Sequence, residues 1–184
     1  MNAPVARRPM HLRRIEMQAF ARDDGLWDIE AHLRDEKPFA FHDPGRGPMK
    51  PGDPVHDIRV RLTVDDARVI REVAVEMGSM PFGICHEVRD SLAPLVGERV
   101  GPGWRNVLKK LPRTATCSHV REVLVPMATV VAQGLSFGRE PEGKVAVVPD
   151  PTLAEPPFFV DDCHSWRVDG PAVAHFYPQF SRRR

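Results

Sequence analysis

Two residues of one short segment, Cys117 and His119, have the types and the spacing to do chemistry together. They stand at the expected start of a helix, where the positive end of the helix dipole and the free backbone N–H groups lower the pKa of a thiol. The imidazole could exchange a proton with that thiol, or both groups could bind one zinc ion. The simpler alternative is a small buried side chain beside a polar residue of the first helical turn. We therefore weigh a reactive thiol, a metal site and plain packing.

A histidine with an acid beside it, His56-Asp57, opens an expected strand. Such a pair can act as a general base or bind a metal, although it could equally be solvated after a proline-rich loop. Cysteine and histidine also adjoin at Cys85-His86 and at Cys163-His164. Three cysteines far apart do not form a disulfide framework, so we expect reduced thiols in the cytoplasm. The spacings match no CxxC pattern, and a zinc site would draw its donors from His56, Cys85, Cys117 and His119.

Alternation of apolar and polar residues predicts strands near 12–21, 26–35 and 57–64. An Asp-Gly pair suits a hairpin turn between the first two, so the three strands form a small antiparallel meander. Its apolar face must be covered by helices. Its polar face carries charges of both signs, which usually form cross-strand ion pairs in solvent. If that face instead lines a cleft, Arg59 and Arg61 would hold a carboxylate through forked hydrogen bonds.

Helical spacing of apolar residues predicts about four helices, over residues 65–77, 85–96, 104–110 and 118–134. Asp65 is expected to cap the first of them. Pro126 should kink the last or split it, because proline lacks the N–H that an interior turn needs. The predicted fold class is therefore α+β, with the meander packed against these helices.

The remaining stretches are less regular. Residues 38–54, rich in proline and glycine, are predicted to form a long loop. A short strand is expected at residues 144–148. The aromatic residues of 158–180 are too many for a disordered tail, so we expect this C-terminal segment to pack back on the domain.

Length and charge place these elements in one soluble domain spanning residues 1–184, with flexible ends at 1–10 and 181–184. A formal net charge of +1 argues against nucleic-acid binding, which needs a clustered basic surface. No apolar run is long enough to cross a membrane, and no signal peptide stands at the start. The sequence therefore predicts a cytoplasmic protein with a small-molecule partner, and it leaves homo-oligomerisation open.

Several motifs, met in order along the chain, resemble a bacterial family, the domain of unknown function numbered twenty-eight eighty-nine. They are Asp24-Gly25-Leu26-Trp27-Asp28-Ile29-Glu30, His56-Asp57 before Arg61-Leu62-Thr63-Val64-Asp65, and Cys117-x-His119 before Pro126-Met127-Ala128-Thr129. The family pattern around the thiol is glycine-cysteine-threonine-histidine, whereas this chain has Thr116 in place of the glycine and Ser118 in place of the threonine. The resemblance implies no activity. It implies a shared set of residues made of His56, Asp57, Cys85, Cys117 and His119, with Cys163 as a further candidate.

Together these features favour a small-molecule enzyme, a lyase or hydrolase acting on an organic acid, with aromatic acids included. Its predicted catalytic residues are Cys117, His119, His56 and Asp57, and its predicted substrate-binding residues are Arg59 and Arg61. Two alternatives stay open. One is a zinc-binding domain with a structural metal. The other is a non-catalytic subunit or adaptor that binds through its aromatic tail.

Overall fold

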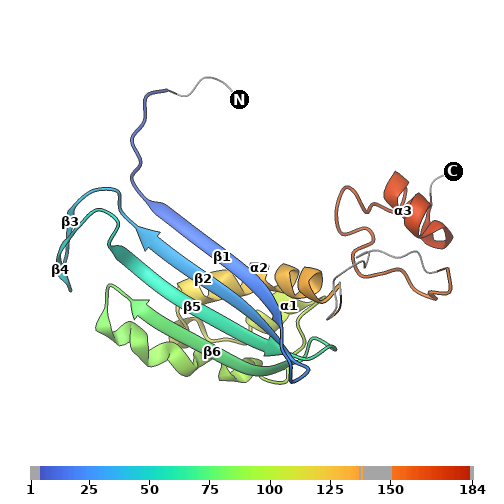
Figure 1. Ribbon diagram of the computed structural model, residues 1–184, viewed down its shortest axis with the longest axis horizontal. Coiled ribbons are helices and arrows are strands. Elements are labelled where there is room, and N and C mark those ends of the chain that lie inside the picture. Colours follow the sequence, from blue (N-terminus) through green and yellow to red (C-terminus); the bar gives the residue numbers. More distant parts are fainter. Residues whose placement is uncertain (1–4, 137, 139–150, 183–184) are drawn as a thin grey trace. The chain divides into compact units, whose positions relative to one another are not determined.

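The computed structural model describes residues 5–136, 138 and 151–182. They belong to two compact units, Met1–Leu135 and Ser136–Arg184, and each unit is described by itself. The larger unit is built on an antiparallel sheet with the strand order β1-β2-β5-β6 (Figure 1). Its strands are β1 (Leu12–Ala21), β2 (Trp27–Glu36), β5 (Pro54–Val64) and β6 (Ile70–Ser79).

Helices cover one face of this sheet, where Figure 1 shows α1 and α2 behind the strands. The helical segments of this unit are the 3-10 segment η1 (Gly83–Leu95), α1 (Trp104–Leu108), the 3-10 turn η2 (Arg113–Ala115) and α2 (Ser118–Ser136). The core lies between the two layers. Its fully buried side chains include Ile29, Leu33, Ile58 and Leu62 from the sheet, with Leu92, Leu124, Met127 and Val131 from the helical layer.

The α+β fold class and the three predicted strands are confirmed, but the helix predicted over 65–77 is wrong, since that stretch contains strand β6. The apolar residues Val73 and Met77 stand four apart, which fits a helix, yet with Val75 they also alternate toward the core as a strand requires. Pairing with β5 decides between the two patterns. Asp65, expected to cap a helix, instead closes the β5–β6 turn by accepting the N–H of Val69 at 2.9 Å.

The predicted loop over residues 38–54 contains a short hairpin, made of β3 (Phe41–Asp43) and β4 (Gly47–Met49). Buried Asp43 holds its turn, because one carboxylate oxygen accepts the N–H groups of Gly45 and Arg46. The Arg46 guanidinium donates to Asp43 and to the hydroxyl of Ser79 on β6. These bonds tie the hairpin to the end of the sheet.

The other helix predictions hold with changes of detail. The segment predicted at 85–96 is the 3-10 segment η1, which accommodates Pro94. Helix α2 is not split at Pro126, since it continues to Ser136, and buried Leu124 and Met127 on either side of the proline anchor it to the core. The strand predicted at 144–148 lies outside the described residues.

Gly134 does not end α2, as the sequence pattern had suggested, but brings the helix close to β1. A Cβ atom at Gly134 would lie 2.6 Å from the Cβ of Ala19. Alanine is the better helix former by about 1 kcal/mol, but the clash with a backbone-fixed methyl group costs roughly 1–3 kcal/mol. We therefore expect Gly134→Ala to lower the free energy of unfolding, measured in urea, by about 1 kcal/mol.

The double variant Ala19→Gly/Gly134→Ala serves as the control for this prediction, because it restores the space while keeping the helix-favouring residue. It should regain stability relative to the single variant. A single variant more stable than the parent would contradict the close packing of α2 against β1.

The smaller unit contains α3 (Pro171–Phe176) and the 3-10 turn η3 (Pro178–Phe180). The predicted aromatic cluster is present, since the ring of Phe159 lies 4.8 Å from that of Trp166 and 6.0 Å from that of Tyr177, centroid to centroid. Val173 and Tyr177 are buried here. In the parts of the chain that the structure describes, no helix has the length and apolar character to span a bilayer.

Candidate functional site

Asp35 and His56 lie opposite each other in the β2–β5 register, at the end of the sheet's core-facing side. Along β2 the core-facing positions are Trp27, Ile29, Ala31 and Leu33, and Asp35 continues the same alternation. Its side chain is only 1% exposed. A carboxylate in a core position must be paired and hydrogen-bonded, because burial of a lone charge is very unfavourable.

Arg13 supplies that pairing through a two-pronged contact from β1. Its Nε and Nη2 atoms each lie 2.7 Å from an oxygen of Asp35, while its Nη1 donates to Glu122 on α2. His11 adds a contact of 3.3 Å from Nε2 to the same carboxylate. Burial by itself would raise the pKa of Asp35, but the hydrogen bonds and charges of Arg13 and His56 outweigh it and lower the pKa to about 2. Asp35 is therefore ionised at neutral pH.

The ionised Asp35 orients the ring of His56, whose Nδ1 lies 2.9 Å from a carboxylate oxygen. Since the carboxylate can only accept, Nδ1 carries the proton and the lone pair of the neutral ring is on Nε2. Burial lowers the pKa of His56, against the opposing effect of Asp35. The ring is thus a neutral base held by an acid, the arrangement that general-base catalysis uses.

Cys117 is the N-cap of α2, because its carbonyl accepts the N–H of Arg121 at 3.0 Å. Its half-buried Sγ lies 3.7 Å from Nδ1 of His119. Burial raises the pKa of this thiol, but the hydrogen bond with His119 and the backbone N–H groups of Val120 and His119 together outweigh burial, so the pKa falls below its usual value. The position of Cys117 at a helix start, as expected from the sequence, is confirmed. Cys117 also packs against the edge of the core.

These two pairs of residues meet through their imidazole rings. The ring centroids of His56 and His119 are 3.9 Å apart, with 38° between the ring planes. One donor atom from each of Asp35, His56 and His119 lies within 4.8 Å of the other two, which makes this the candidate metal-ligand group among the described residues. A thiol, two imidazoles and a carboxylate therefore converge where the end of the sheet meets the start of α2.

The neighbouring hydroxyl of Thr116 is a buried polar group that lacks a partner. The side chain is buried, and among the described residues its Oγ1 has no hydrogen-bond partner. Buried polar atoms are nearly always paired, so this helix start retains an unsatisfied group beside the thiol.

Asp57, predicted to work with His56, lies on the other face of the sheet, because successive residues of a strand point to opposite sides. It accepts from Nε2 of His32 at 2.8 Å there. Arg59 and Arg61 share that face, so the sheet separates them from Cys117 and His119. Arg59 and Arg61, predicted to bind the substrate, therefore do not lie beside the predicted catalytic residues Cys117 and His119.

The other two cysteines lie elsewhere. Cys85 packs against the core from η1, and it is not part of the donor group found in the described residues. Cys163 is exposed in the smaller unit. Each is a free thiol.

Sequence reasoning missed Arg13 and Asp35, although a signal for both was present. Arg13 is in phase with Met17 and Ala19 on β1, which pack against the core, and Asp35 is in phase with the buried residues of β2. Their positions are directly opposed in the β1–β2 register. Opposite charges at facing core positions of adjacent strands predict a buried ion pair, and this would have located one end of the site.

The lowered pKa of the Cys117 thiol permits a direct test of the site's electrostatics. In a Cys85→Ser/Cys163→Ser background, the rate of Cys117 alkylation by iodoacetamide should rise with pH to a plateau. The midpoint of this rise should lie at a lower pH than for an ordinary thiol. His119→Ala should move the midpoint to higher pH, because it removes a hydrogen bond that favours the thiolate. An unchanged midpoint in His119→Ala would contradict the contact between the two side chains.

Comparison with known proteins places the chain in a family. No curated protein and no solved structure matches it. A family model described as "Protein of unknown function (DUF2889)" matches residues 11–133. The match runs from β1 into α2 and contains every residue of the site, but it ends before the smaller unit with Cys163-His164, which the sequence resemblance had included. Since the model matches well over half of the chain, this protein belongs to the DUF2889 family.

Proposed function

We propose that the protein is a small-molecule enzyme, a hydrolase or lyase acting on an organic acid, with a thiol–imidazole centre. The observation that carries the proposal is the contact between the His56–Asp35 pair and the Cys117–His119 pair. It joins a base whose orientation is held by a buried carboxylate to a thiol with a lowered pKa. Both are the features expected of catalytic groups.

In a hydrolytic reaction Cys117 is the nucleophile. The thiolate, held by N–H groups at the start of α2, attacks the carbonyl carbon and forms the S–C bond, and the leaving group departs with a proton from an imidazolium. A water molecule then gives a proton to the same imidazole as it attacks the acyl-enzyme, which releases the acid and restores the thiolate. His56, held by Asp35, and His119, in contact with Sγ, are the two candidates for that proton carrier.

An acidic substrate suits the electrostatics of the site. The first turn of α2 presents the positive end of a long helix, which favours a carboxylate. The unpartnered Oγ1 of Thr116 offers a further hydrogen bond in the same segment. Arg13 is committed to Asp35 and Glu122 and is assigned a structural role.

A panel of esters, thioesters and lactones of aliphatic and aromatic acids provides the first test. We expect turnover of at least one member by the parent protein, and its loss in His56→Ala. The exposed-cysteine variant Cys163→Ser is the matched control and should keep full activity. If His56→Ala and the parent protein act equally on the substrate found, the proposed centre is wrong.

A zinc site is the second candidate, favoured by the donor group of Asp35, His56 and His119. Against it, the two oxygens of Asp35 already accept from Arg13 and His56, so a metal would have to displace one of these donors. Metal analysis of protein purified without a tag and without chelators decides the matter. About one equivalent of zinc, lost in His119→Ala, would favour the metal site, and substoichiometric metal in the parent protein would reject it.

A further inference from the structure

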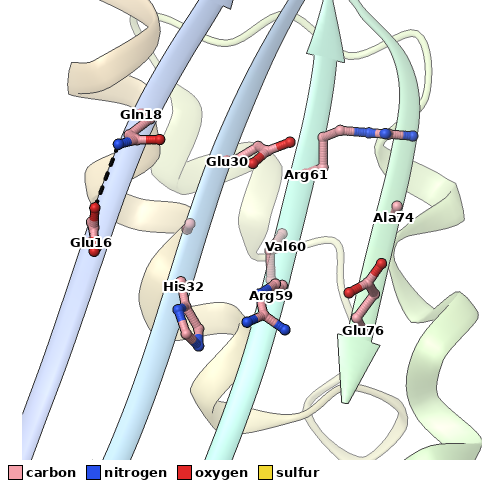
Figure 2. Close-up of a pocket in the computed structure, with 10 residues that line it drawn as sticks. Glu16, Gln18, Glu30, His32, Arg59, Val60, Arg61, Ala74 and Glu76 are labelled. Atoms are coloured by element: carbon pink, nitrogen blue, oxygen red, sulfur yellow. Dashed lines mark hydrogen bonds between the residues drawn. The ribbon is translucent and has the colours of Figure 1, made fainter. Parts of the chain in front are cut away.

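The face of the sheet opposite the helices carries a hollow of about 320 Å³. Within the described part of the larger unit, this is the face that no helix covers in Figure 1. The hollow forms where the small side chain of Ala74 on β6 stands across from Arg61 on β5. Its rim consists of polar side chains from all four strands, namely Glu16, Gln18, Glu30, His32, Arg59, Arg61 and Glu76 (Figure 2).

Two pairs of oppositely charged residues face each other across this hollow from neighbouring strands. The register places Glu30 on β2 opposite Arg61, and Glu76 on β6 opposite Arg59. Facing charges of opposite sign normally pair across a sheet. Neither of these two described pairs comes within ion-pair distance, and Figure 2 shows Arg61 reaching past Ala74 toward β6 instead of turning to Glu30.

The two arginines are weakly paired outside the hollow. The closest carboxylates to Arg61 are those of Glu72, at 3.7 Å, and Asp28, at 4.0 Å, and the closest to Arg59 is Asp57, at 4.0 Å. The Nε of Arg61 is buried and has no hydrogen-bond partner among the described residues. The Arg61 side chain as a whole is 41% exposed, so an acceptor from outside the chain can reach its guanidinium group.

The charge pattern restricts what that acceptor can be. A simple anion at Arg59 and Arg61 would also lie beside Glu30 and Glu76, which repel it. A ligand with an ammonium group at a second position removes this conflict. Adjacent strands are about 4.8 Å apart, so the two charges of the ligand should be separated by about that distance.

We propose that this hollow binds a small zwitterion, a molecule of amino-acid size whose carboxylate meets Arg59 and Arg61 and whose ammonium group meets Glu30 or Glu76. The site lies on the opposite face of the sheet from Cys117 and is independent of the thiol–imidazole centre. A negative result for this binding site would therefore leave the proposed enzymatic function untouched, and the reverse also holds.

Amide chemical shifts in a ¹⁵N-labelled protein, titrated with β-alanine and with 4-aminobutanoate, test the proposal. We expect saturable shifts at residues 30, 59, 61 and 74, with a dissociation constant in the millimolar range for at least one of these probes. Propionate and propylammonium, which carry one charge each, should bind at least tenfold more weakly. Arg61→Ala and Arg59→Ala should each abolish the saturable shifts.

Two matched variants separate this site from other causes. Arg71→Ala removes an arginine of similar exposure that lies outside the hollow, 54% against 56% for Arg59, and it should leave binding unchanged. Cys117→Ser should also leave it unchanged. The proposal is overturned if propionate binds as tightly as the zwitterions, if no saturable shift appears with either zwitterion, or if Cys117→Ser abolishes the shifts.

Discussion

Replacing Cys117 with serine is expected to lower turnover by about a thousandfold or more while leaving the fold intact. Serine has nearly the same shape, so the half-buried position and the N-cap geometry should be kept. Its hydroxyl, however, is not ionised near neutral pH, and removing an activated nucleophile costs enzymes of this type at least this much. The measurement is kcat/KM on the substrate identified from the panel, with thermal unfolding to check the fold.

Two further variants serve as controls for this experiment. Cys163→Ser changes an exposed cysteine of the smaller unit and should stay within about twofold of the parent protein. In the proposed mechanism the thiol and the imidazole act on the same step, so Cys117→Ser combined with His56→Ala should be no slower than the slower single variant. A multiplicative loss in the double variant, or an active Cys117→Ser, would be inconsistent with a shared catalytic step.

Replacing Asp35 with asparagine is expected to lower the free energy of unfolding by about 2–4 kcal/mol. In the parent protein, Arg13 and His56 donate to both carboxylate oxygens of Asp35. The amide of asparagine is neutral and has only one acceptor oxygen for these donors. Breaking a buried ion pair from one side costs roughly 3–5 kcal/mol, and the residual contact of Arg13 with Glu122 offsets part of this. Urea unfolding at neutral pH measures the loss.

The same variant should change how stability depends on acid. A carboxyl group whose pKa is lower in the folded protein contributes stability above its unfolded pKa, near 4, and that contribution is lost as the pH falls toward about 2. The parent protein should therefore lose stability between pH 4 and pH 2 through Asp35, and Asp35→Asn should lack this component.

Glu36 offers a matched control, since it adjoins Asp35 in β2 but points to the opposite face. It is 16% exposed, and its partners Arg14 and Arg34 are 61% and 37% exposed. Exposed ion pairs contribute about 0–1 kcal/mol, so Glu36→Gln should be far milder than Asp35→Asn. Equal losses in the two variants would mean that the buried position of Asp35 has no special role.

Much of the fold was open to prediction because it follows from local periodicity. Strands β1, β2 and β5 alternate cleanly between apolar and polar residues, and α2 repeats apolar residues at helical spacing, so their identity depends on few outside contacts. Strand β6 was not predictable in this way. The spacing of Val73 and Met77 satisfies both periods, and only pairing with β5 selects the strand.

Part of the candidate site could likewise be predicted from the sequence. The sequence by itself determined that Cys117 and His119 lie at a helix start, because capping depends on adjacent residues alone. It also contained the phase of Arg13 and Asp35 along their strands, which marks both as core-facing charges.

Only the tertiary structure decided which partners these residues have. The packing of α2 on the sheet brings His119 into contact with His56. Because side chains alternate along a strand, His56 lies on the core side of the sheet, whereas Asp57, Arg59 and Arg61 lie on its uncovered face. These relations join segments far apart in the chain, so no local pattern encodes them. The same packing of helix against sheet brings the Cys-x-His motif next to the His56–Asp35 pair and separates it from Arg59 and Arg61.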